Sequence, residues 1–143
     1  GDEAIYDDDA ATLREKKVSD LKNRVALINA LPHAVLLSIH QNSMPQHPAV
    51  HGAQVFSNPQ EPAAGLAQSI QQALNLTVNT GNEKTAKAIG DSVYLMKHIT
   101  CPGVLVECGF LSNSDEAQLL RQPEQQKRLA AAMVAGYLNF GNH

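Results

Sequence analysis

An apolar run that leads directly into a carboxylate, Pro102-Gly-Val-Leu-Val-Glu107, constrains the fold of this chain more than any other feature. Continuous valine and leucine, without polar alternation, is typical of a strand that is buried on both faces of a parallel sheet. Ligands of open α/β sheets bind outside the carboxyl ends of such strands. Glu107 is therefore a candidate site residue at the end of a buried strand.

A second apolar run, Ala34-Val-Leu-Leu-Ser-Ile-His40, ends in an imidazole and is followed by the polar Gln41-Asn42-Ser43. Because parallel strands bring their carboxyl ends to the same edge of a sheet, we expect His40 and Glu107 to face one cleft. The predicted fold class is α/β, with a mostly parallel sheet and helices on both of its faces.

Apolar spacing and turn residues divide the remaining chain into helices and strands. Thr12 and Glu15 have the spacing of a capping box, and the helical spacing of Leu21, Val25 and Ile28 predicts a helix with one face on the sheet. We predict helices at 19–31, 62–76, 114–120 and from 123 onward, strands at 34–40, 52–56, 92–97 and 102–107, and loops at 41–51 and 77–91. The strand at 52–56 is expected at or near an edge of the sheet.

Length and composition predict one globular domain, since the chain has 143 residues and 43% of them are hydrophobic. The net charge of −3 gives no overall attraction to nucleic acid or to an anionic membrane. Apolar stretches are shorter than the roughly 20 residues of a transmembrane helix. Cys101 and Cys108 flank one strand, so their Cα atoms should be farther apart than the ~7 Å limit for a disulfide.

The strand-end motifs resemble the zinc-dependent N-acetylmuramoyl-L-alanine amidases. The resemblance rests on Ser38-Ile-His40-Gln-Asn42, on Leu66-Ala67-x-x-Ile70 and on the segment from Pro102 to Asn113. Within this family, the chain most resembles the spore-cortex germination amidase of Gram-positive sporeformers. The segments Gly52-Ala-Gln-Val-Phe56 and Tyr94-Leu-Met-Lys97 support this narrower resemblance. These motifs occur in the family's order and cover nearly the whole chain.

The resemblance implies hydrolysis of the amide between N-acetylmuramic acid and L-alanine in peptidoglycan muropeptides, outside the cytoplasm, in the cell wall or spore cortex. It implies that Glu107 is the catalytic carboxylate and His40 a Zn²⁺ ligand, and that Asn42, Arg24 and Lys87 contact the substrate. From the residues alone, the favoured interpretation of His40 is a hydrogen-bonded histidine at a strand end. Arg24 and Lys87 are then partners in surface ion pairs, and Asn42 orients a loop.

The chain departs from the family pattern at its start. Family members begin with a Gly-His-Gly-Gly turn that carries the first zinc ligand, and the next helix supplies a glutamate ligand; neither occurs here. We therefore expect residues 1–143 to be an N-terminally truncated amidase-like catalytic domain, with a sheet incomplete on its N-terminal side and little or no affinity for zinc.

This departure leaves two alternatives open. Beside the amidase hypothesis, the chain is interpreted as a non-catalytic fragment that binds peptidoglycan or a protein partner, or as a related zinc amide hydrolase or carboxypeptidase. An unpaired sheet edge would also favour association with a second copy, as a homodimer or a swapped assembly.

Overall fold

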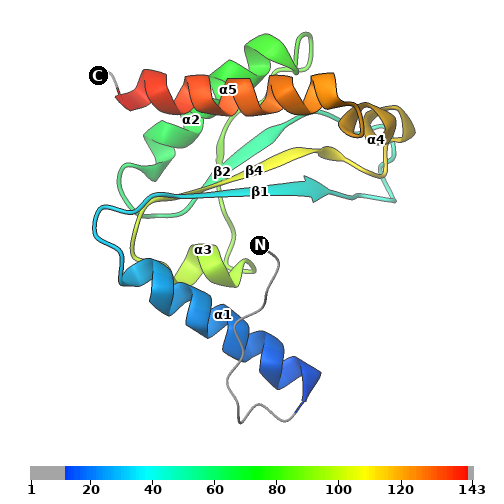
Figure 1. Cartoon of the computed structure of the whole chain (residues 1–143). Helices are drawn as coiled ribbons and strands as arrows, with labels where there is room; N and C mark the ends of the chain where they lie inside the picture. Colours follow the sequence, from blue (N-terminus) through cyan, green and yellow to red (C-terminus); the bar gives the residue numbers. More distant parts are fainter. Residues whose placement is uncertain (1–11, 142–143) are drawn as a thin grey trace.

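The computed structural model describes residues 12–141, which form a sheet with helices on both of its faces (Figure 1). The elements in chain order are α1 (Leu13–Asn29), β1 (Leu36–Asn42), β2 (Gln54–Ser57), α2 (Ala63–Thr77), β3 (Lys87–Ala88), α3 (Tyr94–His98), β4 (Gly103–Phe110), α4 (Ser114–Leu120) and α5 (Pro123–Gly141). No helix in this part of the chain combines the length and apolarity needed to span a membrane.

The strands lie in the order β1-β4-β2-β3. β1 is parallel to β4 and β2 is parallel to β3, whereas β2 and β4 are antiparallel. Two of the three strand pairings are therefore parallel, and the expected α/β class is confirmed. Within residues 12–141, β1 has β4 as its only neighbour, so its other edge is free.

The hydrophobic core lies between the sheet and the helices α2 and α5, which cover one face together (Figure 1). Val104 and Val106 of β4 pack there with Ile70 of α2 and Leu129 and Met133 of α5. The continuous apolar run that precedes Glu107 is buried because β4 is an inner strand of the sheet.

The opposite face of the sheet carries α3, with α1 beyond it (Figure 1). The capping box predicted for α1 is present, because Thr12 and Glu15 bond reciprocally. Asn29 ties the end of α1 to the region of α3, through a bond from the Thr100 amide to its side chain at 2.8 Å. We expected the apolar face of this helix to pack on the sheet. This expectation is wrong, because α1 packs mainly on α3.

The strand predicted at 92–97 is also wrong, because this segment forms the helix α3. Met96 and Ile99 are both 1% exposed and lie against the sheet at Gly103. These two buried residues are three positions apart, a spacing that suits one face of a helix. The rings of Tyr94 and His98, four positions apart, lie with centroids 4.2 Å from each other. A short apolar run does not distinguish a helix from a strand, so tertiary packing determines which of the two forms.

The remaining strand predictions are shifted rather than absent. β1 and β4 extend beyond the expected ends, so Glu107 lies inside β4, three residues before its last residue Phe110. β2 begins two residues later than predicted and lies between β4 and β3. The predicted loop at 77–91 contains the two-residue strand β3, which makes β2 an inner strand next to a short edge strand.

The free edge of β1 is apolar. Leu37 and Ile39 are 41% and 56% exposed. A groove of about 660 Å³ runs between this strand and α5, lined by Ile39, Leu129 and Met133 among others. The edge thus combines unpaired backbone groups with exposed side chains that strands normally bury.

Candidate active site

The two strand-end residues singled out in the sequence are direct neighbours across the sheet. His40 of β1 is the register partner of Glu107 of β4, and the two strands are parallel. Side chains opposite each other on adjacent strands project from the same face. The expected convergence of the imidazole and the carboxylate is therefore confirmed.

Both side chains project from the face that carries α3. Val104, Val106 and Cys108 belong to the core beneath α2 and α5. Because side chains alternate along a strand, Glu107 points to the opposite face. The site thus lies near the carboxyl ends of β1 and β4, on the face away from the main hydrophobic core.

The Glu107 carboxyl group is partly buried and incompletely bonded. Its Oε2 atom is buried and has no hydrogen-bond partner within residues 12–141. Burial raises the pKa of Glu107 above its ordinary value, and neighbouring His40 opposes this increase. A carboxyl group with a raised pKa and a free oxygen is suited to exchange a proton with a bound molecule.

The exposed imidazole of His40 has a partner that the sequence analysis did not identify. Its Nε2 atom lies 2.8 Å from the hydroxyl oxygen of Ser38, two residues earlier on β1. The i, i+2 spacing of Ser38 and His40 in a strand was the available signal, since it places both side chains on one face.

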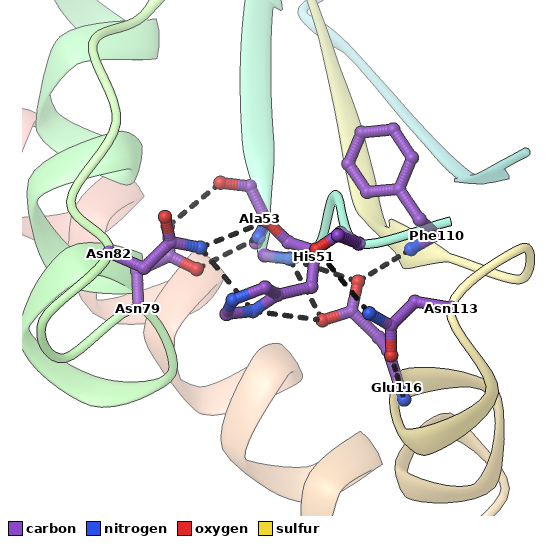
Figure 2. A network of polar contacts seen from close by, with 9 residues as sticks. His51, Ala53, Asn79, Asn82, Phe110, Asn113 and Glu116 are labelled. Atoms are coloured by element: carbon purple, nitrogen blue, oxygen red, sulfur yellow. Dashed lines mark hydrogen bonds and ion pairs between the residues drawn. The ribbon is translucent and has the colours of Figure 1, made fainter. Parts of the chain in front are cut away.

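A second group of polar contacts, missed in the sequence, lies beside this end of the sheet (Figure 2). Glu116 of α4 accepts hydrogen bonds from the backbone amides of Gly52 and Phe110. Asn79 binds both the amide and the carbonyl of Ala53, each at 2.8 Å. The contacts to Gly52 and Ala53 join segments that are remote in the chain, so no local spacing reveals them.

Comparison with known proteins identifies the family. The profile of the N-acetylmuramoyl-L-alanine amidases matches residues 5–139. The chain belongs to this amidase family. The germination-specific N-acetylmuramoyl-L-alanine amidase of Bacillus subtilis is 33% identical over 125 residues, which cover 87% of this chain and 52% of that protein. The chain thus spans about half the length of this curated relative.

Solved structures show the same amidase fold. The CwlD amidase of Clostridioides difficile, in complex with the GerS lipoprotein, is 31% identical with a TM-score of 0.88, over 99% of this chain and 72% of that one. An N-acetylmuramoyl-L-alanine amidase from Clostridium difficile 630 is 26% identical with a TM-score of 0.71, over 85% and 65% of the two chains. The predicted resemblance, including its narrower germination-specific relative, is confirmed.

The resemblance described above implies a zinc cofactor, which needs a group of donor side chains close together. No group of three His, Cys, Asp or Glu side chains within residues 12–141 is placed to hold a metal ion. His40 is available at the site, but a catalytic zinc usually has three protein ligands. The described part of this amidase does not form a complete zinc site.

The substrate contacts predicted from the resemblance lie in different parts of the amidase. Asn42 ends β1 near His40, and its side chain accepts a hydrogen bond from the Ser43 amide at 2.7 Å. Arg24 lies on α1, where it pairs with Asp20 at 2.9 Å. Lys87 lies on β3, at the opposite edge of the sheet from β1. Of these, the structure places only Asn42 on the same strand as His40.

The two cysteines of the amidase are free, and they should differ in reactivity. Burial, with a smaller contribution from Glu107, raises the pKa of Cys108 to about 11, whereas Cys101 is half-buried. Because the thiolate is the nucleophile, iodoacetamide at pH 8 should modify Cys101 faster than Cys108 in the folded protein. Peptide mapping by mass spectrometry measures this difference, which should disappear in guanidinium chloride. Equal labelling of the folded protein would contradict the burial of Cys108.

Proposed function

We propose that the full-length protein hydrolyses the amide bond between N-acetylmuramic acid and L-alanine in peptidoglycan, with Glu107 as general base and general acid. The family match supports the reaction class. The observation that carries the residue assignment is the register pair His40 and Glu107, in which Glu107 has a raised pKa and an unbonded oxygen on the same face of the sheet.

The proposed reaction uses the Glu107 carboxyl group twice. Its carboxylate takes a proton from a water molecule while the water oxygen bonds to the amide carbon. The carboxylic acid then gives that proton to the nitrogen as the carbon–nitrogen bond breaks. The products are a carboxylate on the muramic acid lactyl group and a peptide with a free L-alanine amino terminus. The raised pKa favours the second step, since it keeps the proton available for the leaving nitrogen.

Zn²⁺ is the proposed cofactor of the complete enzyme, with His40 as one ligand. Since residues 12–141 hold no group of three donors, this chain alone should retain much less than one zinc ion after dialysis. Metal analysis of dialysed protein tests this expectation, with the His40→Ala variant as control for non-specific binding. One firmly held ion per chain, lost in His40→Ala, would contradict the expectation.

Product analysis tests the reaction. Purified muropeptides incubated with the full-length protein should acquire new amino termini, identified by amine labelling and mass spectrometry as L-alanine. A carboxypeptidase would instead shorten the peptide stem at its carboxyl end without creating such termini. Binding of muropeptides without any cleavage would identify a non-catalytic peptidoglycan-binding protein.

The proposed place of action is the bacterial cell wall or the spore cortex, by analogy with the germination-specific relative. The CwlD amidase was solved in complex with the GerS lipoprotein, so a protein partner is proposed for this chain too.

Asn42, Arg24 and Lys87 are the proposed substrate contacts. Self-association through the free edge of β1 is the other proposed interaction, and light scattering after size exclusion distinguishes a dimer from a monomer.

A further inference from the structure

We propose that Glu116 is a positioning residue, which fixes Glu107 by holding the ends of β2 and β4 together. This inference rests on the proposed function, because it concerns the geometry of the same site. Glu116 does not act on the substrate itself. Its carboxylate acts through the backbone of the two strands that meet at Glu107.

The contacts of Glu116 lie just beyond Glu107, at the carboxyl end of β4 and before the start of β2, and Figure 2 shows the contact with Phe110. One carboxylate oxygen accepts a hydrogen bond from the Phe110 amide, three residues after Glu107 on β4. Both oxygens face the Gly52 amide, at 3.0 and 2.8 Å. Gly52 lies two residues before Gln54, the residue of β2 that is in register with Glu107. One side chain therefore fixes both strands at the level of the proposed catalytic group.

The same segment also holds the chain that follows His40. The Leu111 amide donates to the carbonyl of Asn42 at 2.8 Å. The Ser112 hydroxyl accepts from the Met44 amide at 2.8 Å. The turn between β4 and α4 is thus bonded both to the end of β1 and, through Glu116, to the start of β2. Movement of this turn would change the positions of His40 and Glu107 together.

The surroundings of Glu116 favour a carboxylate over an amide. Its side chain is 10% exposed, and His51 Nδ1 lies 4.0 Å from Oε2. The negative charge also opposes the lowering of the Lys84 pKa that burial causes. A glutamine has one acceptor oxygen and an NH₂ group, so it cannot accept from Gly52 and Phe110 with two oxygens. The two amides therefore suit a side chain with two acceptor oxygens.

The backbone around this contact requires glycine at two positions. A Cβ atom added to Gly109 would lie within 3 Å of the Glu116 carboxyl group, so a side chain there would displace the carboxylate. Gly52 has a φ of +104°, which L side chains rarely adopt, and its amide thereby faces Glu116. Gly109→Ala is consequently a second way to disturb the contact without changing Glu116.

The test compares Glu116→Gln and Gly109→Ala with Asp115→Asn in the full-length protein. Asp115 is the exposed neighbouring acid on α4, so its variant removes the same charge outside the contact. We expect kcat per folded molecule to fall about 10- to 100-fold in the first two variants, as for a misplaced catalytic group. KM should stay within about twofold, and Asp115→Asn should behave as wild type.

Amide hydrogen exchange, measured on the same proteins, reports the contact independently of activity. The exchange rate of the Gly52 amide should increase in Glu116→Gln and Gly109→Ala. In Asp115→Asn this rate should equal that of the wild type. Faster exchange of the Gly52 amide together with a normal kcat would overturn the positioning role of Glu116. Glu116 would then have a structural role only. Unchanged exchange would overturn the contact itself. An inactive wild-type enzyme would instead refute the proposed function, and the positioning role with it.

Discussion

Replacing Glu107 by glutamine in the full-length amidase should lower turnover by about 10²- to 10⁴-fold, the usual cost of losing a general acid or base. Glutamine keeps the size of the side chain but can neither take a proton from water nor return one to nitrogen. Initial rates of L-alanine amino-terminus release measure the effect. Glu124→Gln is the matched control, since the Glu124 side chain is 84% exposed on α5, and it should retain wild-type turnover.

Stability measurements separate this chemical effect from unfolding. Because the pKa of Glu107 is raised in the folded protein, the folded state binds the proton more tightly than the unfolded state. Glu107 therefore favours folding at low pH, and this contribution is lost as pH rises above the unfolded pKa. A neutral glutamine avoids the loss, so Glu107→Gln should unfold at the wild-type temperature or above it at pH 7. Normal turnover in this variant would remove Glu107 from the mechanism.

Replacing Gly136 by alanine should produce the largest loss of stability among single methyl additions in α5. An added Cβ atom would lie 2.5 Å from the Cα atom of Ile70, so backbone rather than a movable side chain opposes it. The helices α2 and α5 would have to separate, and Ser69, which donates to the Gly136 carbonyl at 2.7 Å, would lose its partner. We expect the free energy of unfolding to fall by about 1–3 kcal/mol.

Denaturant unfolding measures this cost, with Gly141→Ala as the control on the same helix. No atom lies within 4 Å of a Cβ added to Gly141, so this variant should be neutral or slightly stabilising. Equal midpoints for Gly136→Ala and wild type would show that α2 and α5 are not in close contact at this position.

The sequence predicts that His40 and Glu107 lie together, because each residue is placed by the apolar run directly before it. Each apolar run leads to a polar residue near the carboxyl end of a parallel strand, so His40 and Glu107 could be placed together without knowledge of the strand order. The helix α3 could not be predicted in this way. The segment around Tyr94 and Met96 is too short for its periodicity to distinguish helix from strand, and burial against the sheet decides.

The contacts of Glu116 lie beyond the reach of the sequence for a different reason. Asn113 and Glu116 have the spacing of a helix start, and the Asn113 side chain does accept from the Glu116 amide at 3.0 Å. The Glu116 carboxylate, however, binds backbone amides at Gly52 and Phe110, and every residue except proline offers an amide. Residue types alone therefore cannot indicate which amides a carboxylate binds.

The position of β4 between β1 and β2 determines when the site can form during folding. β1 and β2 precede β4 in the chain but do not pair with each other, so β1 has no partner strand until β4 is present and the pair β2–β3 is joined to β1 only through β4. His40 must close a long loop to reach Glu107, and contacts between such distant residues form slowly. Docking of β4 completes the sheet and assembles the site in the same step. A chain arrested before β4 could pair β2 with β3, but His40 would have no register partner.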